Sequence, residues 1–78
     1  MSVTNIVRMA RDKKGLSQAG LAEAMGMTRQ SLSNKSTRDS WTAVDLMKVA
    51  EITGGKLMIV YPDGQQLLFL PDDPMEEE

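Results

Sequence analysis

The sequence predicts a mainly α-helical domain that ends in a β-hairpin. Apolar residues recur at helical spacing from about residue 4 to residue 53. Within this stretch, two short helices are joined at a single glycine. From residue 56 the pattern changes to the period of strands, with a turn signal in the middle. The 78 residues make one domain at most, and a chain this short buries only about 60% of its unfolded surface.

The first helix is expected over residues 4–14. Ile6, Val7 and Ala10 recur on one face of this segment, whereas the charged residues fall mostly on the other face. Gly15 follows the last charged residue, and glycine is the residue that most often ends a helix. The segment therefore predicts a helix that packs its apolar face on the rest of the domain.

Two short helices follow, over residues 18–25 and from residue 29 to about residue 35. Ser17 and Thr28 precede them, and a hydroxyl at this place accepts a backbone N–H of the first helical turn. Gly26 separates the helices and is expected to take a positive φ, which a sharp turn often needs. Two short helices joined by a tight glycine turn are typical of a helix-turn-helix.

The apolar residues of this unit are expected to form the core of the domain. Ala22 must be small, because the second helix of the motif crosses close over it. Met27 follows the turn and fills the corner between the two helices. The other apolar residues predicted to lie in the core are Leu21, Met25 and Leu32.

A fourth helix is expected from residue 43 to about residue 53. The polar segment 36–40 precedes it as a loop that Trp41 anchors on the core, and Thr42 with Asp45 resembles a capping box. The glycines at positions 54 and 55 end the helix. The residues expected to be buried in part are Val44, Leu46, Met47, Val49, Ala50 and Ile52.

Residues 56–61 and 66–70 are predicted to form two strands, with the turn signal Pro62-Asp63-Gly64 between them. Apolar side chains alternate onto both faces of this hairpin, and an isolated two-stranded hairpin is marginally stable in water. One face can pack on the helices, so we expect the other to associate with a second chain in a symmetric dimer. The alternative is a monomer whose hairpin folds back on its own domain. The predicted dimer interface comprises Leu57, Met58, Ile59, Val60, Tyr61, Leu67, Leu68, Phe69 and Leu70.

The composition excludes most catalytic and metal sites. The chain has no cysteine and no histidine, which removes disulfides, thiolate ligands and every catalytic triad that needs an imidazole. The sequence contains no Gly-Lys-Ser/Thr loop that would bind a phosphate. We therefore expect no enzymatic activity, no cofactor and no metal. Residues 1–11 hold no long apolar run, so neither a signal peptide nor a membrane span is expected, and a cytoplasmic location is the default.

The net charge of −2 hides an asymmetry along the chain. Residues 1–61 hold all nine Lys and Arg residues and five acids, a net charge of +4, whereas residues 62–78 hold six acids and no base. A basic front part suits contacts with phosphates, although ordinary surface charge is the alternative. The segment 71–78 holds two prolines and five acids and is expected to be a disordered acidic tail, so the domain spans residues 1–70.

From Gln18 to Lys35 the chain resembles the lambda-repressor-like (Cro/cI, XRE-type) helix-turn-helix family. The first helix and the segment 41–54 fit the first and fourth helices of the same family, so the resemblance covers about residues 4–54. It implies the first four helices of the usual five-helix domain. The residues that carry the resemblance are Gln18, Leu21, Ala22, Met25, Gly26, Met27, Thr28, Ser31 and Leu32.

The chain departs from the family pattern in three places. Lys35 occupies a position that is usually apolar in the family. The loop 36–40 lacks the common glycine and proline pattern, and the hairpin replaces the fifth helix.

The second helix of such a motif lies in the major groove of DNA, with its first residues against the base edges. Arginine can bind guanine with two hydrogen bonds, and glutamine or asparagine can bind adenine in the same way. The alternative is that these polar residues form only a solvated helix face. The predicted base-reading residues are Thr28, Arg29, Gln30, Ser33 and Asn34, and the predicted phosphate contacts are Gln18, Ser31, Lys35 and Arg38.

The resemblance implies a transcriptional regulator that binds specific sequences of double-stranded DNA, and resemblance to compact family members suggests a repressor. With the dimer expected from the hairpin, the predicted protein is a homodimeric regulator. The dimer would set two recognition helices about one DNA turn apart, roughly 34 Å, on a palindromic site. The alternative is a protein-interaction module of the antitoxin type. Such a module would bind a toxin-like partner through the hairpin or the acidic tail.

Overall fold

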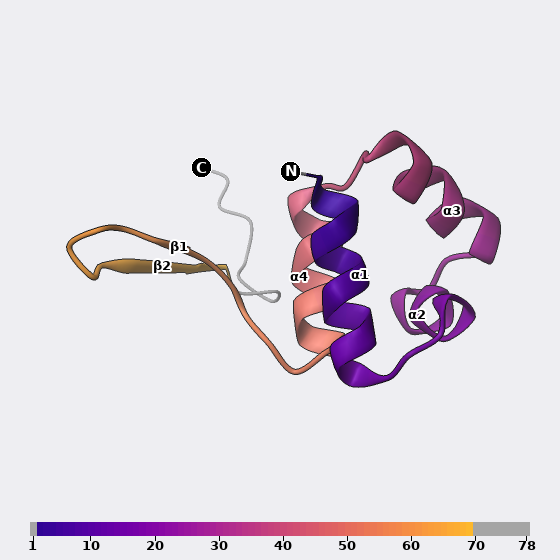
Figure 1. Ribbon diagram of the computed structural model, residues 1–78, viewed down its shortest axis with the longest axis horizontal. Coiled ribbons are helices and arrows are strands. Elements are labelled where there is room, and N and C mark those ends of the chain that lie inside the picture. Colours follow the sequence, from indigo (N-terminus) through magenta and orange to yellow (C-terminus); the bar gives the residue numbers. More distant parts are fainter. Residues whose placement is uncertain (1, 70–78) are drawn as a thin grey trace, which may run out of the picture.

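The computed structural model describes residues 2–69 of the chain. Four helices are followed by a two-stranded antiparallel sheet, which confirms the predicted fold class (Figure 1). Leu70 and the predicted acidic tail lie outside the described residues. The elements are α1 (Val3–Lys14), α2 (Gln18–Met25), α3 (Arg29–Arg38), α4 (Ala43–Ile52), β1 (Leu57–Val60) and β2 (Gln66–Phe69).

Each helix begins at a serine or threonine whose hydroxyl accepts a backbone N–H three residues further on. The capping box at the start of α4 is present, because the Asp45 carboxylate accepts the backbone N–H of Thr42 while the Thr42 hydroxyl accepts that of Asp45. These caps explain why the predicted starts of α2, α3 and α4 agree with the structure. The four capping residues are Ser2, Ser17, Thr28 and Thr42.

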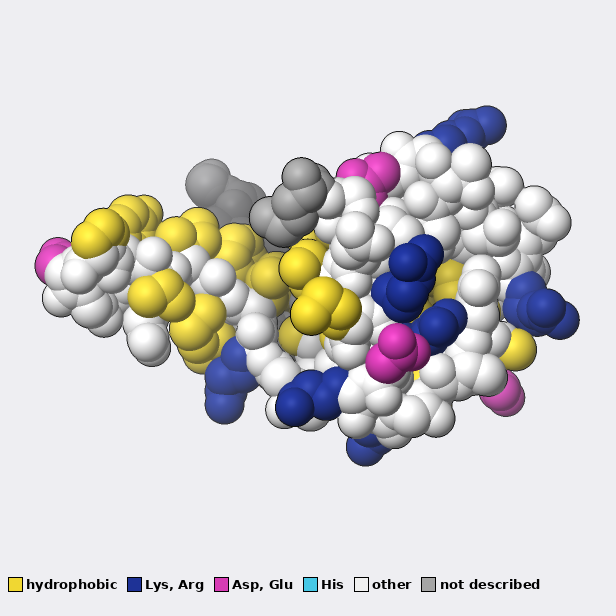
Figure 2. Space-filling view, viewed as in Figure 1, with side chains coloured by type: hydrophobic (Ala, Val, Ile, Leu, Met, Phe, Trp, Pro, Cys, Tyr) yellow, Lys and Arg dark blue, Asp and Glu magenta, His cyan; other side chains and the backbone are white. Residues whose placement is uncertain are grey.

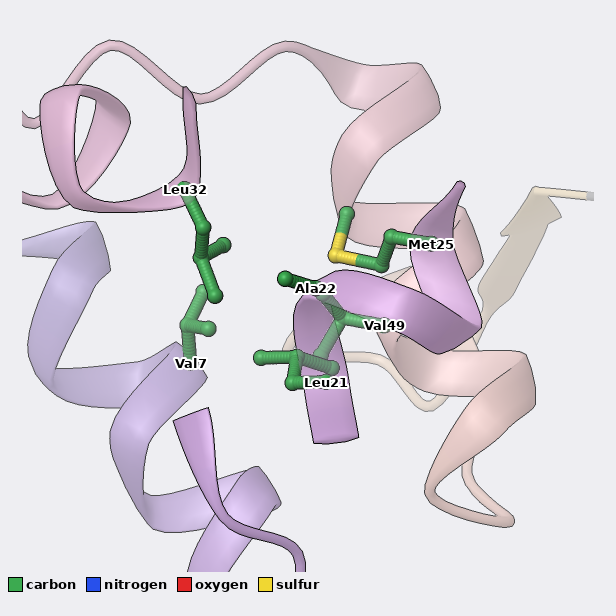
Figure 3. Packing of buried hydrophobic residues seen from close by; sticks show 6 residues of the cluster. All are labelled: Val7, Leu21, Ala22, Met25, Leu32 and Val49. Carbon is green, nitrogen blue, oxygen red and sulfur yellow. The ribbon is translucent and has the colours of Figure 1, made fainter. Parts of the chain in front are cut away.

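The core lies where all four helices meet. Leu21, Ala22 and Met25 enter it from α2, and Leu32 of α3 points toward Val7 of α1 (Figure 3). Ala22 is fully buried, as its predicted place beneath the crossing helix requires. Figure 3 also shows Val49, the contribution of α4 to the same cluster.

One residue of α4 that was expected to be partly buried is exposed to solvent. Val44 is exposed, whereas Val49 is buried. Five residues at 3.6 per turn place these two side chains about 140° apart around the helix axis. A single helix face cannot bury both, so the prediction for Val44 is wrong.

The third helix is longer than predicted. It continues through Ser36 to Arg38, residues that the composition assigned to a loop. Asp39 ends it with a φ of 54°, in the left-handed region that residues other than glycine rarely adopt. The Asp39 carboxylate accepts hydrogen bonds from the backbone N–H groups of Val3 and Thr4, at 3.3 and 2.7 Å. These contacts with the start of α1 hold the left-handed residue in place.

Thr4 links the contact between Asp39 and α1 to the segment that connects α3 and α4. Its hydroxyl lies 2.7 Å from the Asp39 carboxylate and 3.0 Å from the carbonyl oxygen of Ser36. The indole N–H of Trp41 donates to the same hydroxyl at 2.9 Å. Trp41 also packs on the core, as predicted, so it joins the α3–α4 connection to α1 by both apolar and polar contacts.

The hairpin projects away from the helices (Figure 1). Leu57 pairs with Phe69 and Ile59 with Leu67, so these residues share one face of the sheet. The base of the hairpin lies next to α4, and Leu57 and Phe69 are only partly exposed there. Farther out, the side chains on both faces are exposed, so only the base of the hairpin packs on the helices. Among residues 2–69, no helix is long and apolar enough to cross a membrane.

The hydrogen bonds between Asp39 and the start of α1 should make the stability of the domain sensitive to acid. Hydrogen bonds from the hydroxyl and the backbone N–H of Thr4 hold the pKa of Asp39 below the usual aspartate value. The unfolded chain therefore binds this proton more tightly, so the stabilisation is complete above about pH 4 and is lost as the pH falls through the folded-state pKa. Asp39→Asn should lower the free energy of unfolding at pH 7 and flatten its fall below about pH 4. Urea unfolding between pH 7 and about pH 2.5 measures both effects.

The matched control for this experiment is Glu23→Gln, which removes an exposed carboxylate of α2. It should change the free energy of unfolding at pH 7 by less than about 0.5 kcal/mol. An acid dependence of Asp39→Asn equal to that of the unmodified chain would contradict the proposed role of these hydrogen bonds of Asp39.

Candidate nucleic-acid interface

The outer face of α3 is open to solvent at the end of the molecule opposite the hairpin (Figure 1). Arg29, Gln30 and Asn34 are all exposed, and Ser33 is half-buried. Leu32 is the only residue of α3 that is buried. One apolar side chain thus points inward, and the polar residues on the opposite side of the helix remain accessible.

The turn before α3 fixes where this helix begins. Gly26 has a φ of 75°, as predicted, and its N–H group donates to carbonyl groups of the last turn of α2. The backbone N–H of Met27 donates to the carbonyl of Ala22 at 3.0 Å, and the Met27 side chain packs on the core. The turn is therefore closed by hydrogen bonds and covered by an apolar side chain.

Four of the predicted site residues line one open depression of about 460 Å³. Gln18 comes from the first residue of α2, and Arg29, Gln30 and Ser33 come from the first half of α3. Their side chains supply one guanidinium, two amides and one hydroxyl, so the depression offers hydrogen-bond donors and acceptors and one positive charge. The fold thus brings together residues from both helices of the motif.

Two of the predicted base-reading side chains bind each other. The amide nitrogen Nε2 of Gln30 donates to Oδ1 of Asn34 at 3.1 Å, one turn further along α3. This bond orients both amides. It leaves Oε1 of Gln30 and Nδ2 of Asn34 without a hydrogen-bond partner among residues 2–69. An acceptor and a donor are the two kinds of group that an adenine edge binds in the major groove.

Thr28 has a structural role. Its hydroxyl accepts the backbone N–H of Ser31 at 3.0 Å and donates to the Ser31 hydroxyl at 3.0 Å. Its hydrogen and one of its two lone pairs are therefore used at the start of α3. The Ser31 hydroxyl is exposed and retains its own hydrogen for donation.

Lys35 forms an ion pair with α4. Its ammonium group is 2.9 Å from Oδ2 of Asp45, and the side chains are 27% and 12% exposed. Burial alone would raise the pKa of Asp45, but the hydrogen bond and charge of Lys35 and the N–H of Thr42 lower it overall. The charge of Lys35 is thus matched by α4, which explains how a lysine fits at a position that is apolar in the resembling family. Arg38 is exposed at the other end of α3 from Arg29.

Two arginines of α1, which were expected on the face of that helix opposite its apolar residues, also reach this region. Arg8 and Arg11 line a small pocket of about 70 Å³ together with Gln18. Nε of Arg11 is buried and has no hydrogen-bond partner among residues 2–69. Their spacing of three residues places both guanidinium groups on one helix face, which is the signal that could have identified them. Residues 2–69 contain no group of three or more acidic side chains placed to hold a metal ion.

The ion pair between Lys35 and Asp45 predicts a measurable coupling. Most of each side chain is shielded from solvent, so the pair should contribute more than an exposed surface pair. In a double-mutant cycle of Lys35→Met and Asp45→Asn, we expect a coupling energy of about 1–2 kcal/mol in the free energy of unfolding. Lys48→Met, at an exposed position of α4, is the control and should be neutral. Additive effects of the two substitutions would show that the pair adds nothing.

Comparison with known proteins identifies the same region. A family described as helix-turn-helix matches residues 7–34, from the middle of α1 to Asn34 in α3. In the same comparisons, no curated protein and no solved structure matched the chain. The matched segment contains Gln18, Arg29, Gln30 and Ser33, which line the depression. The predicted resemblance is thus confirmed over residues 7–34, which form a helix-turn-helix, a motif that binds DNA.

Proposed function

We propose that this chain binds specific sequences of double-stranded DNA as a homodimer and regulates transcription, most simply as a repressor. The observation that carries the proposal is the open depression that Gln18 shares with Arg29, Gln30 and Ser33. A helix-turn-helix presents these two helix starts to DNA, the second in the major groove. A dimer that covers a promoter represses without catalysis, which suits a chain that lacks histidine and cysteine.

In this proposal the first half of α3 reads bases. Arg29 binds guanine, and the linked amides of Gln30 and Asn34 bind adenine through their free oxygen and nitrogen. Ser33 lines the depression between these groups, and Thr28 acts by capping the helix that carries them.

Phosphate contacts surround the base-reading residues. Gln18 and Ser31 are exposed at the starts of α2 and α3, where backbone N–H groups add to an anion site. Arg38 is exposed at the end of α3 and is assigned a phosphate contact. Lys35 is assigned to the ion pair with Asp45 in place of a phosphate. The charge of α3 supports this surface, because Arg29 and Arg38 are exposed and its ten residues include no acid.

The hairpin is proposed as the dimer interface. Its outer half exposes apolar side chains on both faces, with Val60 60% exposed, and Figure 2 shows apolar atoms along its length. Two chains that associate through these residues would bury surface that neither buries alone. The described residues of the interface are Leu57, Met58, Ile59, Val60, Tyr61, Leu67, Leu68 and Phe69.

Selection of bound duplexes from a random pool tests the proposed sequence reading. Arg29→Ala and Gln30→Ala should each weaken binding to the selected duplex by about 1–3 kcal/mol, or roughly 5- to 150-fold, and relax the preference at one base position. Arg38→Ala should weaken binding to all duplexes alike and reduce the salt slope by about one. Lys48→Ala, at an exposed position of α4, is the charge-matched control and should bind as the unmodified chain does. Equal affinity for selected and random duplexes would overturn the proposal.

Sedimentation tests the dimer separately from DNA. At tens of micromolar the chain should sediment with twice the mass of one copy. Val60→Lys should shift it toward the monomer, because the substitution places a charge in the proposed interface. Met9→Lys is the control, since Met9 is 66% exposed on α1, outside the hairpin. A single monomeric species in the unmodified chain would rule out the dimer and leave the DNA-binding proposal standing.

A further inference from the structure

An apolar groove runs between α1, α4 and the base of the hairpin. Its volume is about 440 Å³, and its lining contains two lysines and no acidic residue. Ile6 lines it and is 49% exposed, which leaves a large apolar side chain open to solvent. The apolar residues that define the groove are Val3, Ile6 and Ala10 of α1, Leu46 and Ala50 of α4, and Leu57 of β1.

The hairpin of the same chain does not fill this groove. Leu57, the first residue of β1, lines the groove at its edge, and the rest of the hairpin projects away from the helices (Figure 1). Figure 2 shows apolar surface that continues from the hairpin onto the adjoining helices. The groove and the exposed hairpin are therefore two parts of one apolar surface that residues 2–69 leave open to solvent.

We propose that the outer half of the hairpin of a second copy occupies this groove. The inference rests on the proposed homodimer and specifies its contact. When two hairpins lie side by side about a two-fold axis perpendicular to them, the tip of each lies beside the base of the other. The groove begins at that base, so the two-fold arrangement carries each tip to the groove of the other copy.

The dimensions of the two surfaces agree. A strand of four residues, such as β1, spans about 13 Å, and a helix of 12 residues, such as α1, spans about 18 Å. The length of β1 is thus less than that of α1, which forms one wall of the groove. Its outer residues Ile59, Val60 and Leu67 are all exposed and apolar, and they match the apolar lining.

The charges of the two surfaces are also complementary. Asp63, at the turn, is the only charged residue between Leu57 and Phe69. The two lysines that line the groove are Lys13 and Lys56. An acidic tip beside two bases favours this pairing over a groove occupied by an uncharged or basic segment.

Disulfide trapping tests the contact cleanly, because the chain has no cysteine of its own. Ile6→Cys places a thiol in the groove, and Val60→Cys places one on the outer hairpin. When the two single variants are mixed and oxidised, mass spectrometry should find the mixed dimer, with a disulfide between positions 6 and 60, in excess over both symmetric dimers. Met9→Cys mixed with Val60→Cys is the control, since Met9 is exposed on α1 but does not line the groove, and it should give no such excess.

A second variant tests how much the same contact contributes to the affinity of the dimer. Ile6→Glu should weaken the dimer at least about tenfold in sedimentation, because it places a carboxylate in the apolar groove. Met9→Glu should leave the dimer unchanged. Both side chains are exposed in the single chain, so both variants should fold, and circular dichroism checks this.

The outcomes separate the two proposals. No excess of the mixed dimer over that of the Met9→Cys control, or an Ile6→Glu variant that dimerises normally, would overturn the groove contact and leave the dimer intact. A monomeric unmodified chain would overturn both.

Discussion

The position of α3 depends on the burial of Leu32. This leucine is the only buried residue of the helix, and it lies against Val7 of α1 and the buried face of α2 (Figure 3). Such a side chain contributes about 1.5–3 kcal/mol through loss of apolar surface from water. Because one inward side chain suffices, the outward positions of the helix can all be polar. The polar face of α3 is accessible because a single apolar side chain attaches the helix to the core.

Polar contacts also hold α3 in its position. Lys35 ties the middle of α3 to Asp45 of α4, and Asp39 ties its end to the start of α1. The two acids connect α3 to different helices, so together with Leu32 they fix both the tilt and the register of α3. Asp45 also caps α4, which makes the position of α3 and the start of α4 depend on one carboxylate.

Most of the fold could be predicted from the capping residues, glycines and apolar spacing of each segment. The bounds of α2 agree with the structure because Ser17 and Gly26 mark its ends within the sequence itself. The end of α3 could not be predicted in this way. Its last residues are polar, and the contact that stabilises Asp39 comes from Thr4, 35 residues earlier in the chain. The exposure of Val44 likewise depends on which face of α4 meets the other helices.

In the candidate site too, features of a single helix could be predicted and contacts between helices could not. The exposed residues of α3 could be named from the motif, since their place on the helix follows from its period. The ion pair of Lys35 and the approach of Arg8 and Arg11 to Gln18 depend on how separate helices pack. Which of the exposed residues contact bases, and whether two hairpins associate, remain predictions.

The two ends of this molecule share no residue. The outer face of α3 lies at one end and the hairpin at the other, with the four-helix core between them (Figure 1). On the proposed assembly, substitutions in the hairpin change which chains pair, and substitutions in α3 change which operator is read. Duplicated genes could therefore diverge into regulators that keep a common operator but no longer form mixed dimers.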